Sequence, residues 1–112
     1  MTVDREISIL GTIYTIGYKK PEEDSFLEKC DGYCDASSKS IVINKENRNK
    51  VGDWDAVMKQ SLRHEIIHAY LNESGLQHNF QHCNEFGHEE TMVDWFAIQF
   101  YKISKTFEEL GI

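Results

Sequence analysis

The chain has 112 residues, of which 40% are hydrophobic and 12% aromatic. This length predicts one domain spanning residues 1–112, and this composition excludes a disordered chain, because enough apolar side chains are present to build a core. The formal charge of −7 repels phosphate backbones, so we expect no nucleic-acid partner. No apolar stretch is long enough to predict a membrane span.

The cysteine content and the first residues bear on the cellular compartment. The start, MTVDREISIL, has neither the basic flank nor the long apolar stretch of a secretory signal, so we expect a cytoplasmic protein. The odd set of Cys30, Cys34 and Cys83 predicts reduced thiols and not a disulfide scaffold. A second, structural zinc site built from these cysteines and nearby histidines is the alternative.

The first part of the chain predicts strands. Residues 6–18 are rich in Ile, Thr and Tyr, and Gly11 stands where a tight turn would join two strands, which together predict a hairpin. Residues 32–36 and 40–44 predict two short strands on either side of a polar turn at residues 37–39.

The second part of the chain predicts two helices. Asp53 is a candidate N-cap for a helix over residues 54–73, and Gly75 is a candidate stop. A second helix is expected from about Glu89 to Leu110. Its apolar stripe, expected to face the core, comprises Met92, Val93, Phe96, Phe100, Ile103 and Phe107. The plan is an α+β fold, in which a small antiparallel sheet (the N-terminal hairpin plus two short strands) packs on two long helices.

The chemistry-bearing motif is HEIIH at residues 64–68. On a helix, His64 and His68 leave the same face about one turn apart, and two imidazoles at that separation can bind one zinc ion. Glu65 is rotated by about 100° around the axis, which places it beside the metal. There it can take a proton from a zinc-bound water, whose pKa the metal lowers to about 7. The alternative is a helix with two exposed or hydrogen-bonded histidines.

A catalytic zinc site needs a third protein ligand. The metzincin pattern HExxHxxGxxH would require Gly and His where the chain has Leu71 and Ser74, which excludes that class. Glu90 and Asp94 lie one turn apart on one face of the second predicted helix. Glu90 can reach the metal while Asp94 accepts the free ring N–H of His64, which would fix the orientation of that ring.

HEIIH followed by Glu90 and Asp94 resembles the gluzincin zinc peptidases, the thermolysin-type arrangement. The small size, the preceding strands and the stretches HEETMVDWFAIQF and DGYCDASSKSIVIN resemble compact phage-encoded and ImmA/IrrE-type metallopeptidases. The resemblance covers roughly residues 6–107. It implies a minimal zincin-like fold in which His64, His68 and Glu90 hold the zinc. It also implies that Glu65 is the general base and that Asp94 supports the metal-binding His64 by a hydrogen bond.

The same resemblance implies how a substrate would bind. It places the strand at residues 41–44 at the edge of the sheet, where a peptide would add as an extra strand by main-chain hydrogen bonds and would contact Ile41 and Ile43. The chain lacks the DNA-binding or sensor segments that ImmA/IrrE regulators often carry, so repressor cleavage is not expected. A phage or bacterial-host origin is suggested by this resemblance only.

The sequence therefore predicts a zinc-dependent metallopeptidase that acts on a peptide or protein substrate. Water attacks the peptide carbonyl, and Glu65 takes its proton and delivers it to the leaving amine. Substrate and oligomeric state are left open by the sequence.

Alternatives to this prediction concern the third ligand and the activity. His82 could be the third ligand, as in the SprT-like group, and Glu90 would then be an ordinary acidic residue at a helix N-terminus. The chain could also be a catalytically silent, zinc-stabilised binding or scaffold protein. A fourth protein ligand such as His82 or Cys83 would then complete the coordination of the zinc and leave no position for water. In the peptidase, His78 or His88 is a candidate for stabilising the oxyanion of the tetrahedral intermediate.

Overall fold

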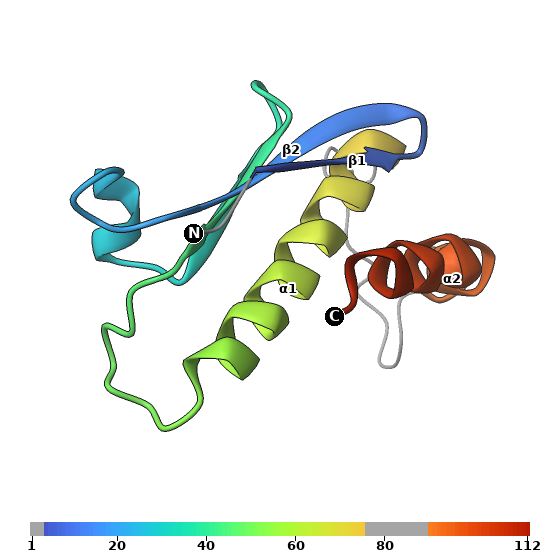
Figure 1. The fold of residues 1–112 in the computed structure, drawn as a ribbon. Helices are drawn as coiled ribbons and strands as arrows, with labels where there is room; N and C mark the ends of the chain where they lie inside the picture. Colours follow the sequence, from blue (N-terminus) through green and yellow to red (C-terminus); the bar gives the residue numbers. More distant parts are fainter. Residues whose placement is uncertain (1–3, 76–89) are drawn as a thin grey trace.

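The computed structural model describes residues 4–75 and 90–112, except for the side chains of residues 90, 91, 93, 94 and 97 (Figure 1). Its elements are β1 (Arg5–Ile9), β2 (Thr12–Lys19), the short 3-10 helix η1 (Ser25–Glu28), β3 (Gly32–Asp35), β4 (Ser40–Asn44), α1 (Trp54–Ser74) and α2 (Glu90–Leu110). This architecture confirms the α+β class that the sequence predicts.

A tight turn joins β1 to β2 where the sequence predicts it. Leu10 and Gly11 have φ values of 51° and 91°, the left-handed conformation that a two-residue hairpin turn of this kind requires. The two strands pair antiparallel. The hairpin residues that enter the hydrophobic core are Ile7, Ile9, Tyr14 and Ile16. One face of the hairpin is therefore apolar and covered, as the alternating pattern predicts.

The strands are arranged in the order β1-β2-β4-β3. The pairs β1–β2 and β3–β4 are antiparallel, as expected, but β2 and β4 run parallel, so the sheet is mixed and not wholly antiparallel. The chain leaves β2, passes through η1 and β3, and enters β4 in the same direction as β2. Such a crossover is what parallel neighbours require.

The strand β4 lies in the interior of the sheet and not at the edge that we expected. It pairs with β2 on one side and with β3 on the other, and Ile41 and Ile43 are fully buried. The expected edge position is therefore wrong, and with it the main-chain contact of Ile41 and Ile43 with a substrate. The physical reason is that Ile41, Val42 and Ile43 are all apolar, a pattern typical of a strand that is covered on both faces.

The helix α1 packs against one face of the sheet (Figure 1). Leu62, Ile66 and Ala69 recur at helical spacing and are buried in the same cluster as the apolar residues of β1, β2 and β4. Removing a side chain of the size of Leu or Ile from water stabilises the fold by about 1.5–3 kcal/mol. This stripe therefore determines which face of α1 is turned toward the sheet.

Hydrogen bonds fix the beginning of α1. The Asp53 carboxylate accepts a hydrogen bond from the backbone N–H of Ala56, which confirms the predicted N-cap. The indole N–H of Trp54 donates to the backbone carbonyl of Asn44 at 3.1 Å. Asn44 itself is fully buried, and its side-chain amide donates to the carbonyl of Leu27 in η1. The start of α1, the end of β4 and η1 are thus held together.

The end of α1 is fixed by a carboxylate. Gly75 has a φ of 84° and ends the helix, as predicted. Just before it, the Glu73 carboxylate accepts hydrogen bonds from the hydroxyl of Tyr14 at 2.7 Å and from Nζ of Lys39 at 2.8 Å. Tyr14 belongs to β2, and Lys39 belongs to the turn between β3 and β4. Glu73 therefore ties the helix to two parts of the sheet.

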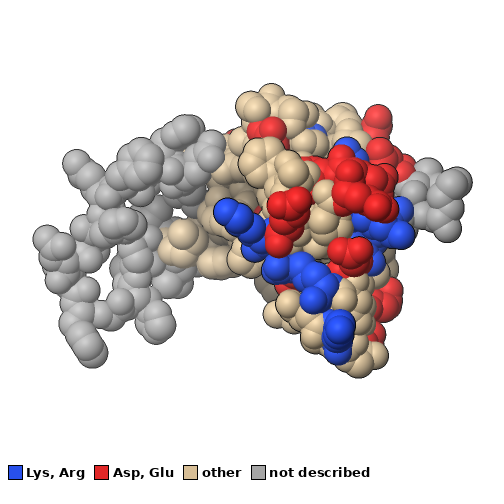
Figure 2. All heavy atoms as spheres, turned by 90° about the vertical axis from the view of Figure 1, so that its left-hand side faces the viewer, with Lys and Arg blue, Asp and Glu red and all other residues tan. Residues whose placement is uncertain are grey.

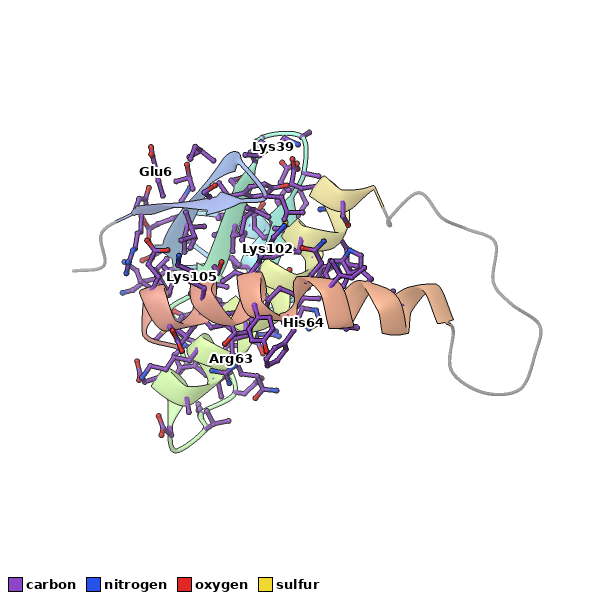
Figure 3. All side chains as sticks on the ribbon, turned by 90° about the vertical axis from the view of Figure 1, so that its right-hand side faces the viewer. Glu6, Lys39, Arg63, His64, Lys102 and Lys105 are labelled. Atoms are coloured by element: carbon purple, nitrogen blue, oxygen red, sulfur yellow. The ribbon has the colours of Figure 1, made fainter. Side chains whose placement is uncertain are left out.

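The helix α2 crosses α1 (Figures 1 and 3). Its buried face joins the same hydrophobic core, and polar contacts also hold it to α1. The Tyr70 hydroxyl lies 2.7 Å from Oγ1 of Thr106 and donates to the carbonyl of Lys102 at 3.2 Å. The indole N–H of Trp95 donates to Oγ of Ser74 at 3.0 Å. The beginning of α2 therefore lies at the end of α1.

Two members of the expected apolar stripe of α2 are not in the core. Phe96 and Phe100 are 43% and 60% exposed, whereas Trp95 and Ile103 are buried. Phe96 follows Trp95 by one residue, which turns it about 100° away from the side that meets α1. Placing Phe96 and Phe100 in the core was therefore wrong, because the buried face is centred on Trp95, Ile103 and Thr106.

Charged side chains of both signs are interspersed on the face of the molecule that Figure 2 shows. Ion pairs link Arg48 to Asp31 at 2.9 Å and Lys59 to Asp55 at 3.3 Å. Within residues 4–75 and 90–112, neither helix is long and apolar enough to cross a membrane.

The contact between Glu73 and the sheet gives a prediction for folding stability. Hydrogen bonds from Lys39, Tyr14 and Thr12 lower the pKa of Glu73 from 4.5 to about 2. The stabilisation is therefore fully present above pH 4.5 and is lost as the pH falls toward 2. We expect Glu73→Gln to lower the free energy of unfolding in urea by about 1–2 kcal/mol at pH 7, and the difference from wild type to shrink below pH 4.5.

Asp55→Asn is the control for this prediction, since Asp55 pairs with Lys59 on the exposed surface of α1. Its effect on the free energy of unfolding should stay below about 1 kcal/mol. Equal effects of the two variants, or a Glu73→Gln effect that does not depend on pH, would contradict the role given to Glu73.

Candidate metal centre

The HEIIH motif occupies the middle of α1, and the helix distributes its residues over three environments. Ile66 falls on the face that packs on the sheet. His64 and His68 lie one turn apart on a side turned away from the core, and both are exposed. Glu65 lies between these two faces and is only 7% exposed. The motif thus has two accessible imidazoles beside one buried carboxylate.

The separation of the two imidazoles suits a zinc ion. Nε2 of His64 lies 3.2 Å from Nε2 of His68, with the ring planes at 68°. Two nitrogens bound to a tetrahedral zinc at about 2.0–2.1 Å would be about 3.3–3.4 Å apart. Candidate ligand atoms of His64, Glu65 and His68 all lie within 4.8 Å of one another. The residues therefore fit the metal, although a hydrogen bond between the two rings accounts for the same distance.

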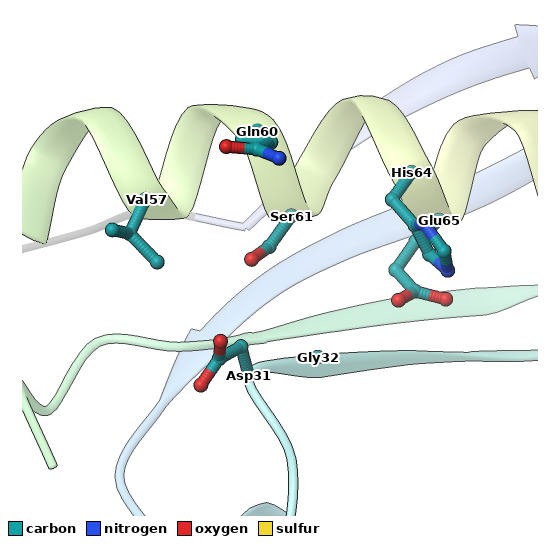
Figure 4. Close-up of a pocket in the computed structure, with 7 residues that line it drawn as sticks. All are labelled: Asp31, Gly32, Val57, Gln60, Ser61, His64 and Glu65. Atoms are coloured by element: carbon teal, nitrogen blue, oxygen red, sulfur yellow. The ribbon is translucent and has the colours of Figure 1, made fainter. Parts of the chain in front are cut away.

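The Glu65 side chain extends from α1 toward β3 (Figure 4). Burial raises the pKa of Glu65, and the neighbouring imidazoles of His64 and His68 act in the opposite direction. A carboxylate with a raised pKa is a stronger base than an exposed one, so this position suits the abstraction of a proton from water.

Gly32, the first residue of β3, allows the strand to approach Glu65. A Cβ atom at this position would lie 2.8 Å from Cδ1 of Ile43, 3.0 Å from the carbonyl oxygen of Val42 and 3.6 Å from Cγ of Glu65. The first two distances are shorter than van der Waals contact. Glycine is therefore required for the close packing of β3 on β4 beneath the carboxylate.

A cleft lies between α1 and β3, and HEIIH lies midway along it. One part, of about 320 Å³, is bounded by Asp31, Gly32, Val57, Gln60, Ser61, His64 and Glu65 (Figure 4). The adjoining part, of about 470 Å³, is bounded by Gly32, Tyr33, Cys34, Ala36, His64, Glu65, His68 and Asn72. Both parts share Gly32, His64 and Glu65. We call this the α1–β3 cleft.

The β3 side of this cleft is not among the site residues predicted from the sequence. Gly32 and Cys34 are spaced by two, so both face α1, and the amide of Asn72 donates to Sγ of Cys34 at 3.8 Å. Burial and the nearby carboxylates of Glu65 and Asp35 raise the pKa of Cys34 to about 11, so it stays a protonated thiol at neutral pH. Cys30 and Cys34 form no disulfide with each other. The sequence feature that could have indicated the close approach of β3 to α1 is Gly32, a glycine at the start of a short predicted strand.

Glu90 and Asp94 lie on the first turns of α2, but their side chains fall outside the part that the structure describes. The neighbouring Trp95 contacts Ser74, which is six residues after His68, or about 9 Å along α1. Glu90 as third ligand and Asp94 as the partner of His64 stay predictions. The alternatives that involve His78, His82, Cys83 and His88 also lie outside the described residues.

Comparison of the chain with protein-family models, with curated proteins and with solved structures finds no match. Membership of the gluzincins therefore stays a prediction from the motif residues, of which the structure brings together His64, Glu65 and His68.

Metal binding by these residues is directly testable. We expect the purified chain to bind one zinc ion, and His64→Ala and His68→Ala each to weaken binding by at least about 100-fold, because each removes a ligand. Zinc content after dialysis, measured by atomic emission, is the readout. Gln60→Ala, one turn before His64 and also exposed, should bind zinc as the wild type does.

The same measurement separates the two candidates for the third ligand. Loss of zinc from Glu90→Ala with retention in His82→Ala supports the gluzincin arrangement. The opposite result supports the SprT-like one, and full zinc binding by His64→Ala would remove HEIIH as the site.

A second test concerns the approach of β3 to α1. Gly32→Ala should lower the free energy of unfolding by about 1–3 kcal/mol, because the added methyl group meets the backbone carbonyl oxygen of Val42 and the end of the Ile43 side chain, which is packed in the core. Gly52→Ala is the matched control, since a Cβ there meets no atom within 4 Å. A stability of Gly32→Ala equal to that of Gly52→Ala would show that β3 is not held where the structure places it.

Proposed function

We propose that this protein is a zinc-dependent metallopeptidase. The observation that carries the proposal is the pair of Nε2 atoms of His64 and His68, 3.2 Å apart, beside the buried Glu65 carboxylate in an open cleft. A purely structural metal site would not require a buried base next to its ligands, nor a cleft that leads to them.

Each residue has one task in the proposed reaction. His64, His68 and, by prediction, Glu90 would hold a zinc ion, which would act as a Lewis acid and make water nucleophilic near neutral pH. Glu65 accepts the proton of the attacking water and passes it to the nitrogen of the leaving amine. Asp94 is proposed to accept the free ring N–H of His64 and to keep that ring oriented.

The edge strand β3 supports an extended peptide as the substrate. The backbone N–H of Asn44 donates to the carbonyl of Asp31 at 2.9 Å, which makes these two residues a hydrogen-bonded pair. Because such pairs alternate in an antiparallel ladder, the N–H and C=O groups of Gly32 and Cys34 point away from β4. A peptide can therefore add to β3 as a further strand, and its scissile bond would lie beside Glu65. This replaces β4 by β3 as the substrate-binding strand.

Replacing the proposed base tests the function. Glu65→Gln should lower the cleavage rate of denatured, fluorescein-labelled casein by at least about 100-fold, because proton transfer by a positioned group contributes that much or more. Zinc content and melting temperature should remain those of the wild type, since glutamine has the same shape. Cleavage is followed by the release of fluorescent peptides.

Glu108→Gln is the matched control, because Glu108 is exposed near the end of α2. It should cleave at the wild-type rate. Undiminished cleavage by Glu65→Gln would refute the assigned role, and a zinc-loaded wild type that cleaves no peptide would favour the silent scaffold.

A further inference from the structure

Two aromatic rings are held in place beside the edge strand. The Phe26 side chain in η1 is 74% exposed, and its ring lies 5.6 Å from that of Tyr33 in β3, at an angle of 55°. The Asp24 carboxylate organises both residues: Oδ1 accepts the backbone N–H of Phe26 at 3.1 Å, and Oδ2 accepts the hydroxyl of Tyr33. We call Phe26 and Tyr33 the aromatic shelf.

The aromatic shelf borders a hollow that shares three lining residues with the α1–β3 cleft. This hollow, of about 300 Å³, is lined by Phe26, Tyr33, Cys34, Asp35 and Ala36. Tyr33, Cys34 and Ala36 also line the cleft that contains His64 and Glu65. The two spaces therefore lie beside the same short stretch of the edge strand β3.

The alternation of side chains along β3 divides the two spaces between the faces of the sheet. Gly32 and Cys34 face α1, because they pair with the buried Ile43 and Ile41. Tyr33 lies between them and faces the other side, toward Phe26. A peptide strand added to this edge would alternate in the same way, with every second side chain in the cleft and the next one over the shelf.

We propose that the aromatic shelf binds a large apolar side chain of an extended peptide that pairs with β3, at a position within two residues of the cleaved bond. The position relative to a cleaved bond rests on the proposed function, whereas the binding of a peptide rests only on the free edge of β3. A well-oriented, exposed phenylalanine gains from being covered by an apolar group, and Leu, Met, Phe or Tyr would supply that group.

The experiment uses binding and cleavage side by side. The full-length Glu65→Gln chain, loaded with zinc, is applied to an array of immobilised random ten-residue peptides, and the wild type is given the same peptides in solution, with cleavage sites read by mass spectrometry. We expect bound and cleaved peptides to be enriched in large apolar residues at one position. Phe26→Ser should reduce this enrichment by about fivefold or more, which corresponds to partial burial of one such side chain.

The control is Ile13→Ser, which removes an apolar side chain that is 53% exposed on β2. It should keep the enrichment, and Phe26→Trp should keep it as well. An unchanged preference in Phe26→Ser, with an unchanged melting temperature, would overturn the proposal. Cleavage without any apolar preference would also overturn it while leaving the peptidase intact. Binding with the preference but without cleavage would support the shelf and refute the peptidase.

Discussion

The packing of one face of α1 on the sheet is the constraint on which the site depends. Leu62, Ile66 and Ala69 determine the rotation of the helix about its axis. The bond from Trp54 to Asn44 and the contacts of Glu73 with the sheet determine its position along that axis. A rotation of α1 about its own axis by about 100°, the angle between successive residues, would move Glu65 out of the interface with the sheet or move the histidines into it. The geometry of HEIIH is therefore a consequence of core packing.

The burial of Glu65 is what distinguishes this motif from two histidines on a helix surface. A carboxylate loses hydration when it is buried, so its basic form is reached only at a raised pH unless positive charge lies nearby. A divalent ion held by His64 and His68 would supply that charge, since the ligand atoms lie within 4.8 Å of one another. Burial, metal affinity and basicity are thus linked through one short stretch of α1, and the edge strand β3 completes the enclosure through Gly32.

The strand order shows where local patterns stop being informative. Both antiparallel pairs are joined by short turns and could be predicted, because the turn residues specify the pairing. The parallel pairing of β2 with β4 joins segments about 25 residues apart, and no local pattern specifies it. The apolar run from Ile41 to Ile43 was the available signal for an interior strand. The family resemblance instead placed β4 at the edge of the sheet, so the β3 side of the cleft was not predicted.

The sequence by itself determined the α+β class, the caps of α1 at Asp53 and Gly75, and the shared face of His64 and His68, because these follow from helical periodicity and local hydrogen bonding. Only the tertiary structure decided that Glu65 is buried, that β3 is the strand beside it, and that Phe26 and Phe100 are exposed. These features arise from contacts between segments far apart in the chain, and the free energy of such contacts depends on which elements meet and not on the pattern within any one of them.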